Sequence, residues 1–322
     1  MPKWKALILA SRPPFLQVTI ASVLAGILIA LMHSGNINWL LALSTLAIAC
    51  LLHLSVNLIH EYWDWKSGTD NINIHAFRPF TGGSGMIQLG FISPKEELLF
   101  GLSLLAIGIA LGIYVILAVI EVFWHLIIIG AIAVFSIIFY TGSPIKLAHR
   151  GLGEFFIFLN FGPLMSLGPY IVLTKSFHIE VVYAGILLGL FTAGIIIINE
   201  FPDREADKIA GKWHLIVRLK PEKGASLFFF VMITPYILVL VGILLGILPY
   251  WAIITLIVLP KTLQVTRHCF MYYDSPKELF PANINTIKNH LLFSVMLLIS
   301  YVISYFSSIA YVSIFEWLTI SL

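Results

Sequence analysis

The sequence predicts an all-α membrane protein that crosses the bilayer about nine times. Of its 322 residues, 59% are hydrophobic and only 11% are charged, and the mean hydropathy is +0.97. A soluble domain carries about 25% charged residues, so this chain has too few charges to cover a surface in water. Apolar runs recur along it, each long enough to cross about 30 Å of hydrocarbon.

Nine apolar runs are the candidate spans. The eighth is the weakest, because Pro260 and Lys261 interrupt it. Their boundaries are uncertain by a few residues, as is usual for sequence patterns. The candidate spans are residues 15–32, 39–59, 98–120, 122–140, 155–174, 181–198, 226–245, 249–265 and 291–314.

The basic residues predict the orientation of these spans. Lys and Arg in short loops favour the cytoplasmic side. With a cytoplasmic N-terminus and nine spans, every one of the 19 Lys and Arg residues except Lys175 falls on the cytoplasmic side. The spans themselves are almost free of charge, which disfavours a transporter with an ionisable site at the midplane. We therefore expect a multi-pass integral membrane protein whose N-terminus and functional loops face the cytoplasm.

A first cluster of polar residues follows the second span. Asn57 and Glu61 share one helix face, and His60 and Asp64 share another, because residues four apart lie on the same face. Asp70 follows after a glycine turn that would bring it back towards Asp64. Carboxylates gathered at a helix end repel one another unless a cation is present, so this cluster predicts a cation site.

A second cluster follows the sixth span, where Asn199, Asp203 and Asp207 form one helical stripe. Mg²⁺ prefers oxygen ligands and commonly bridges one or two carboxylates to phosphate. Two such clusters on one side of the membrane predict a site in which Mg²⁺ holds a diphosphate. The basic residues available to neutralise the remaining phosphate charge are Arg78, Lys146, Arg204 and Lys208.

Either cluster alone is as typical of a solvated helix end as it is of a functional site. Two clusters after spans two and six, on the same side, favour a functional site. The separation of four spans also hints at an internal repeat within one membrane domain, residues 1–322. We expect two four-helix-like halves, about 12–150 and 151–290, followed by a last helix at about 291–314.

These motifs resemble the UbiA superfamily of intramembrane aromatic prenyltransferases, and most closely its 1,4-dihydroxy-2-naphthoate branch in menaquinone synthesis. That branch carries an Asn-x3-Asp-x5-Asp motif, met here by His60, Asp64 and Asp70, and an Asp-x3-Asp motif, met by Asp203 and Asp207. His60 stands where the family usually has Asn. The similarity continues through Arg78-Pro79-x-Thr81-Gly82-Gly83, Tyr140-Thr-Gly, Lys146, Gly151-Leu-Gly-Glu154, Phe161-Gly162-Pro163 and Leu215-Ile-Val-Arg218-Leu.

The resemblance implies a UbiA-type helical bundle around a central chamber and Mg²⁺-dependent transfer of a polyprenyl group from a polyprenyl diphosphate to a small aromatic acceptor. In the dihydroxynaphthoate branch the products would be demethylmenaquinone, diphosphate and CO₂. The implied catalytic residues are Asp64, Asp70, Asp203 and Asp207, which would hold two Mg²⁺ ions, with Arg78 and Lys146 on the diphosphate.

The expected substrate-binding residues lie around these motifs. Tyr140 and Phe161, with Tyr62 and Trp63, are candidates for cation–π contact with an allylic carbocation. Gly162 and its neighbours in span five suggest either a kinked wall beside the substrate or close helix packing. The remaining substrate-binding candidates are Asn57, His60, Glu61, Asn160, Asn199, Arg204 and Lys208.

Other functions remain open at this level. The same fold could act on 4-hydroxybenzoate, homogentisate, haem, chlorophyllide or the glycerol-phosphate backbone of archaeal lipids. A transporter or scaffold would leave the paired acidic motifs unexplained. Besides its substrates the expected partner is the lipid bilayer. The small, dispersed net charge of +3 gives no reason to expect nucleic-acid binding, and no obligate protein partner is indicated.

Overall fold

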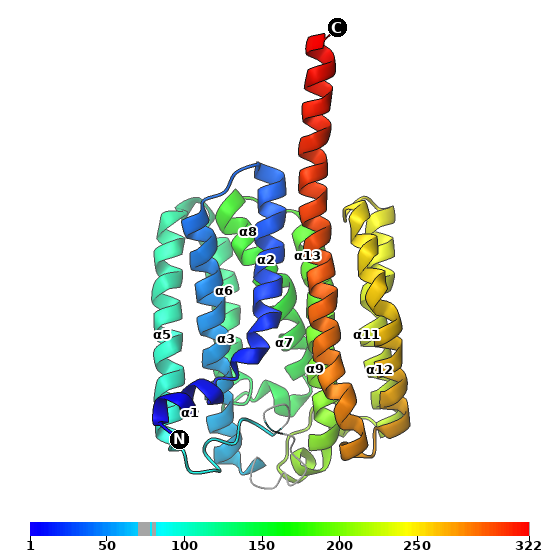
Figure 1. The fold of residues 1–322 in the computed structure, drawn as a ribbon. Coiled ribbons are helices and arrows are strands. Elements are labelled where there is room, and N and C mark those ends of the chain that lie inside the picture. Colours follow the sequence, from blue (N-terminus) through cyan, green and yellow to red (C-terminus); the bar gives the residue numbers. More distant parts are fainter. Residues whose placement is uncertain (70–77, 79–81, 322) are drawn as a thin grey trace.

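The chain forms a bundle of long helices that run alternately up and down (Figure 1). This computed structural model describes residues 1–69, 78 and 82–321, with side chains described as far as residue 307. Within that part of the chain, eight helical stretches are long and apolar enough to span a membrane. The all-α, multi-pass membrane class predicted from the sequence is confirmed.

The helices begin at α1 (Lys3–Ala10), which lies across one end of the bundle and was not predicted (Figure 1). The predicted first and second spans are α2 (Leu16–Ser34) and α3 (Trp39–Ser67). The remaining long elements are α5 (Pro94–Ala118), α6 (Phe123–Phe139), α7 (Gly153–Leu159), α8 (Met165–Thr174), α9 (Ile179–Ile209), α11 (Pro221–Leu244), α12 (Leu259–Tyr272) and α13 (Pro276–Ser321).

Short elements connect them, and one explains the weak eighth span. There the chain forms a 3-10 helix, Tyr250–Val258, and then α12, which carries Pro260 in its first turn. Proline is tolerated there because its missing N–H would be unpaired in any case. The other short elements are Pro13–Phe15, Ile120–Val122, Leu147–Arg150, the π-helix Asn160–Leu164 and α10 (Leu215–Arg218).

The sequence sets the helix ends through their caps. The Asn38 side chain accepts a hydrogen bond from the Leu41 N–H at the start of α3. Ser93 and Glu96 form a capping box at the start of α5. Gly68 ends α3 with φ of 81°, a left-handed conformation that glycine adopts without steric cost. These caps fix where α3 begins and ends and where α5 begins.

The most buried helix is α9, which packs against α2, α11 and α13 in the main apolar core. Its glycines allow α7 and α8 to approach closely, because a Cβ on Gly162 would lie 2.6 Å from the Gly189 Cα. Helix packing is therefore one role of this glycine. Small residues at such contacts are typical of helix association in membranes.

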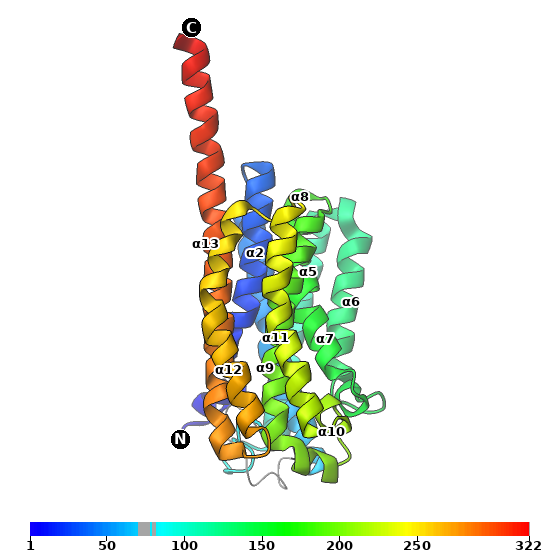
Figure 2. The same cartoon turned by 90° about the vertical axis from the view of Figure 1, so that its right-hand side faces the viewer.

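The two ends of the bundle differ. We call the end where α3 and α9 finish, at Ser67 and Ile209, the motif end; α1 and α10 also lie there (Figures 1 and 2). The opposite end, where α2 finishes at Ser34 and α9 begins at Ile179, is the distal end. Both acidic motifs therefore belong to the same end of the molecule.

Candidate active site

One cavity at the motif end brings the two acidic motifs together. Helix α3 contributes His60 and Asp64, and α9 contributes Asn199, Asp203 and Asp207. These residues are far apart in the sequence, and the antiparallel course of the bundle returns α9 to the end where α3 finishes. The cavity, called here the polar cavity, is lined by these residues and by Arg12, Asn57, Glu200 and Lys212.

Lys212 connects the two motifs. Its Nζ lies 3.5 Å from Asp64 Oδ2 and 3.8 Å from Asp207 Oδ2. Burial alone would lower the pKa of Lys212, but the carboxylates of Asp207 and Asp64 outweigh it and hold that pKa well above its usual range. The ammonium group therefore offsets part of the negative charge that the motifs concentrate here.

His214 connects Asp207 to a second buried carboxylate. Its Nε2 lies 3.0 Å from Asp207 Oδ2 and its Nδ1 lies 3.2 Å from Glu200 Oε2. Burial works against the charged imidazole, but Glu200 and Asp207 raise the pKa of His214 to about 10. His214 therefore links Asp207 of the second motif to Glu200.

Glu61 binds the loop that covers the cavity instead of facing the cavity. Its carboxylate accepts backbone N–H bonds from Ser84, at 2.9 Å, and Gly85, at 3.0 Å, and lies 3.7 Å from the Arg12 guanidinium. The same loop reaches the second motif, since Gly82 N–H donates to Asp203 Oδ2 at 3.2 Å. Gly82 and Gly85 both have positive φ, so the sequence Gly-Gly-Ser-Gly permits this turn.

The two asparagines of the motifs also make structural hydrogen bonds. Asn57 Nδ2 donates to the Ser11 carbonyl at 2.9 Å, joining α3 to the segment after α1. Asn199 Oδ1 accepts from Asn283 Nδ2 at 2.8 Å, joining α9 to α13. Both still line the polar cavity.

The predicted basic residues lie elsewhere. In the described part of the chain, the lining of the polar cavity does not include Arg78, Lys146, Arg204 or Lys208. Arg204 donates to the Ile216 carbonyl, Arg78 donates to Gln88 and Lys208 is exposed. Lys146 is half-buried on the loop before α7, close enough to His149 that, after burial and Lys212, it helps to lower the pKa of His149 to about 4. Asp70 lies outside the described residues.

His60 and Tyr140 form the inner wall of the polar cavity. Their rings stack with centroids 4.4 Å apart and an angle of 16° between their planes. The His60 Nε2 is buried and makes no hydrogen bond to the described part of the protein. Both rings also line a second cavity, together with His53, Val56, Ile157 and Phe161.

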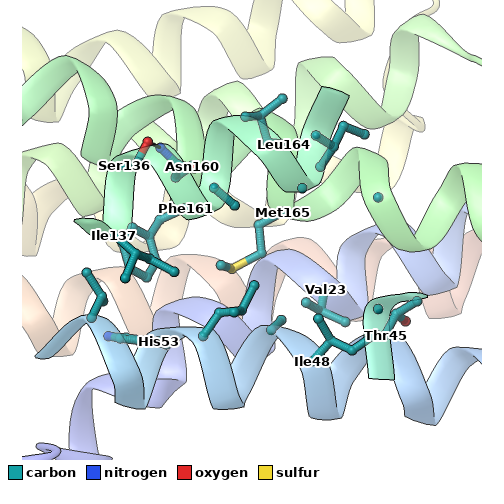
Figure 3. Close-up of a pocket in the computed structure, with 18 of the residues that line it drawn as sticks. Val23, Thr45, Ile48, His53, Ser136, Ile137, Asn160, Phe161, Leu164 and Met165 are labelled. Atoms are coloured by element: carbon teal, nitrogen blue, oxygen red, sulfur yellow. Dashed lines mark hydrogen bonds between the residues drawn. The ribbon is translucent and has the colours of Figure 1, made fainter. Parts of the chain in front are cut away.

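The second cavity, called here the apolar cavity, lies between α3, α5, α6 and the α7–α8 pair, and its volume is about 210 Å³ (Figure 3). Asn160 is one of its few polar residues. Its Nδ2 donates to Ser136 Oγ at 2.9 Å, and its Oδ1 is buried without a hydrogen bond in the described structure. Gly168 and Pro169 also line this cavity, so span five does form a wall beside it.

Sequence reasoning did not single out Arg12, Glu200, Lys212 or His214 as site residues. Lys212 follows Gly211, whose φ of 76° turns the chain back after α9. The sequence feature that could have identified Lys212 is therefore a glycine followed by a lysine shortly after the second acidic motif. Of the four predicted aromatic partners, Tyr140 and Phe161 line the cavities, whereas Tyr62 and Trp63 are not among the lining residues of the described chain.

The two acidic motifs at one polar cavity, with an apolar cavity beside it in a bundle of membrane-length helices, agree with the resemblance of the sequence motifs to intramembrane prenyltransferases. Residues 19–287 match the UbiA prenyltransferase family. The chain belongs to this family.

Relatives and a solved structure agree with that assignment. The chain is 26% identical over 294 residues to the 2-carboxy-1,4-naphthoquinone phytyltransferase of Synechocystis sp., covering 90% of each protein. It is 25% identical over 296 residues to the 1,4-dihydroxy-2-naphthoate octaprenyltransferase of Bacillus subtilis, covering 92% of each. The fold is similar to a UbiA homolog from Archaeoglobus fulgidus described as bound to DMAPP and Mg²⁺, with a TM-score of 0.61, 15% identity and coverage of 90% of this chain and 98% of that one.

Proposed function

We propose that the protein transfers a polyprenyl group from a polyprenyl diphosphate to 1,4-dihydroxy-2-naphthoate in a Mg²⁺-dependent reaction that releases diphosphate and CO₂ and gives the hydroquinone form of demethylmenaquinone. The observation that carries this proposal is the junction of the two cavities. Asp64 and Asp203 line the polar cavity, and His60 and Tyr140 lie between it and an apolar cavity of about 210 Å³. A charged head group and a long apolar tail need this pair of environments.

The carboxylates fit a magnesium ion by their chemistry. Asp64 Oδ1 is buried and has no hydrogen-bond partner in the described chain, which is costly unless a cation or donor binds it. Mg²⁺ prefers such oxygen donors and keeps several waters beside phosphate. We propose that Asp64, Asp203 and Asp207, with Asp70, hold two Mg²⁺ ions, which would stabilise negative charge on the diphosphate.

Other residues of the chain would bind and orient the donor. Lys212 and Arg12 line the polar cavity and supply positive charge for the diphosphate oxygens. Arg78 and Lys146 on the surrounding loops, and Arg204 or Lys208 in the last turns of α9, remain candidates. The apolar cavity would hold the isoprenoid tail and keep water away from the reacting carbon. Tyr140 and Phe161 lie at the junction, where an aromatic face is worth about 0.5–2 kcal/mol to a nearby cation.

The acceptor is proposed from the relatives. The two relatives described above act, by their names, on carboxylated naphthalene rings. In the proposed reaction the allylic C–O bond breaks and its electron pair leaves with diphosphate. A ring carbon of the acceptor forms the new C–C bond to the prenyl group. The ring carboxylate then leaves as CO₂, and its bonding pair restores the aromatic electrons.

We also propose that the motif end faces the cytoplasm. The helix ends and loops at this end contain most of the Lys and Arg residues of the chain. Lys175 follows α8 at the distal end, and Lys261 and Lys288 lie within α12 and α13. Basic loops are retained on the cytoplasmic side during insertion. A cysteine placed at exposed Lys208 should then be labelled by an impermeant reagent in inverted vesicles and protected in right-side-out vesicles. The reverse pattern would overturn the orientation.

The function is tested with the purified chain, Mg²⁺, a polyprenyl diphosphate and a panel of acceptors, with mass spectrometry of the products. We expect prenylation of 1,4-dihydroxy-2-naphthoate, with a product mass that shows loss of the carboxylate. A product formed instead from 4-hydroxybenzoate, homogentisate or a glycerol phosphate would overturn the acceptor and leave the donor chemistry in place. No product from any acceptor, with folded protein, would contradict the reaction itself.

A further inference from the structure

We propose that the distal end carries a second metal site, a zinc-type site formed by His33, His178 and Glu180. His33 lies in the last turn of α2, His178 is the N-cap of α9 and Glu180 lies in the first turn of α9. Glu180 and Asp207 are on the same helix, and its rise of 1.5 Å per residue places them about 40 Å apart. The proposed site is therefore separate from the carboxylates of the polar cavity.

The three potential ligand atoms are already close together. Glu180 Oε2 lies 2.9 Å from His33 Nε2 and 3.9 Å from His178 Nδ1, and the ligand atoms of all three residues lie within 4.8 Å of one another. Tetrahedral zinc has bonds of about 2.0–2.2 Å, so its ligand atoms are about 3.3 Å apart. Small side-chain adjustments would bring the three atoms onto one ion, with water as the fourth ligand.

A neighbouring hydroxyl group holds one of these ligands in a suitable orientation. His33 Nδ1 lies 2.8 Å from the Tyr170 hydroxyl, so it can donate its proton there and leave the Nε2 lone pair facing Glu180. Metal-bound histidines almost always have such a partner on the other nitrogen. Glu180 is itself buried, with 7% of its surface exposed.

His178 supplies the adjustable ligand. Its Nδ1 accepts a long backbone bond of 3.3 Å from Glu180, and its side chain is 48% exposed. The ring can therefore turn towards an ion without displacing packed neighbours. Two histidines and one glutamate form a recurrent zinc ligand set with an open position, whereas Mg²⁺ and Ca²⁺ prefer oxygen alone. These ligands select a divalent transition metal.

The experiment measures zinc and cobalt binding to the purified full chain in detergent, after chelation and with excess Mg²⁺ present. We expect one Zn²⁺ per chain, an increase in the melting temperature and, with Co²⁺, the visible absorption of a tetrahedral site. His33→Gln and His178→Gln should each weaken zinc binding at least about tenfold, the loss seen even for residues that only orient metal ligands. Asp203→Ala should bind zinc as the native chain does.

His125→Gln is the matched control, because His125 is an exposed histidine on α6 at the same end of the bundle. It should leave zinc affinity and the cobalt spectrum unchanged. Melting without metal shows whether each variant is folded. Equal zinc affinity in the native chain and in a folded His33→Gln/His178→Gln double variant would overturn the proposal. Loss of binding in the Asp203→Ala variant would overturn it too, because the metal would then occupy the polar cavity.

Discussion

The polar and apolar cavities share a wall but differ in how their polar groups are paired. In the polar cavity the carboxylates of Asp64 and Asp207 are linked through Lys212, and Asp207 is linked onward to His214. In the apolar cavity the polar groups are few, and the Asn160 amide bonds locally to Ser136. Charge is thus concentrated on one side of the His60–Tyr140 pair and excluded from the other. This difference fits the proposal that the polar cavity holds the diphosphate and the apolar cavity holds the isoprenoid tail.

Removing a carboxylate from the polar cavity should have the largest effect. Asp64→Ala or Asp203→Ala should lower diphosphate release by about 10²–10³-fold or more, the range for loss of one group that stabilises transition-state charge. Diphosphate release and prenylated product are the measurements. Asp274→Asn is the matched control, since Asp274 is an exposed acid in the α12–α13 turn. Full activity of either alanine variant would contradict the metal-binding role.

Removing the cation between the motifs should come next. Lys212→Met leaves Asp64 and Asp207 without their shared partner, and breaking a buried ion pair from one side costs about 3–5 kcal/mol. We expect a lower melting temperature without metal. Added Mg²⁺ should raise that temperature more in the variant than in the native chain, because the metal replaces the missing charge. An equal Mg²⁺ response in both proteins would show that Lys212 does not neutralise this cluster.

His214 should make the stability of the motif end depend on pH. Its folded pKa of about 10 lies above the ordinary histidine value of 6.5. A raised pKa stabilises the fold fully below the unfolded value, and this contribution is lost as pH rises through the folded value. The melting-temperature difference between the native chain and His214→Gln should therefore be greatest below pH 6.5 and shrink towards pH 10. A difference that grows with pH would contradict the charged state of His214.

Filling the apolar cavity should affect long donors and spare short ones. Gly130 lines this cavity, and a Cβ there would meet no atom within 4 Å. Gly130→Leu should therefore fold, yet raise KM severalfold for a long polyprenyl diphosphate. The five-carbon donor dimethylallyl diphosphate is the internal control and should be unaffected. Equal losses with both donors would show that the tail lies elsewhere.

Changing His60, in the wall between the two cavities, should have the smallest effect on activity. His60 stacks on Tyr140, and its Nε2 has no partner in the described chain. If the position serves as the family asparagine does, His60→Asn should keep activity within about tenfold, equal to ~1.4 kcal/mol. Steady-state rates with both substrates measure this. A folded but inactive variant would assign His60 a role of its own.

The sequence predicted the spans and the pairing of the motifs well, because hydropathy and helical spacing are local properties. It did not predict α1, whose Ala6 and Ala10 are buried only because the chain folds back over α3 and α5. It predicted that Glu61 binds the substrate, whereas this carboxylate accepts hydrogen bonds from the backbone N–H groups of Ser84 and Gly85. Such partners come from tertiary contacts, which no local spacing reveals.

The same limit explains why the sequence predicted the wrong basic residues for the polar cavity. Spacing along α9 placed Arg204 and Lys208 beside the acidic stripe, but Arg204 turns to the Ile216 carbonyl and Lys208 faces outward. Lys212 reaches both motifs because the chain reverses at Gly211. A side chain beyond a turn can point in many directions, and the sequence does not choose among them.

The glycine contact between Gly162 and Gly189 has a mechanical consequence. With no room for a Cβ, the π-helical turn packs directly on α9, so the wall of the apolar cavity is in close contact with the helix that carries Asp203. A donor tail in the apolar cavity would therefore lie against the same packed unit that carries the second acidic motif.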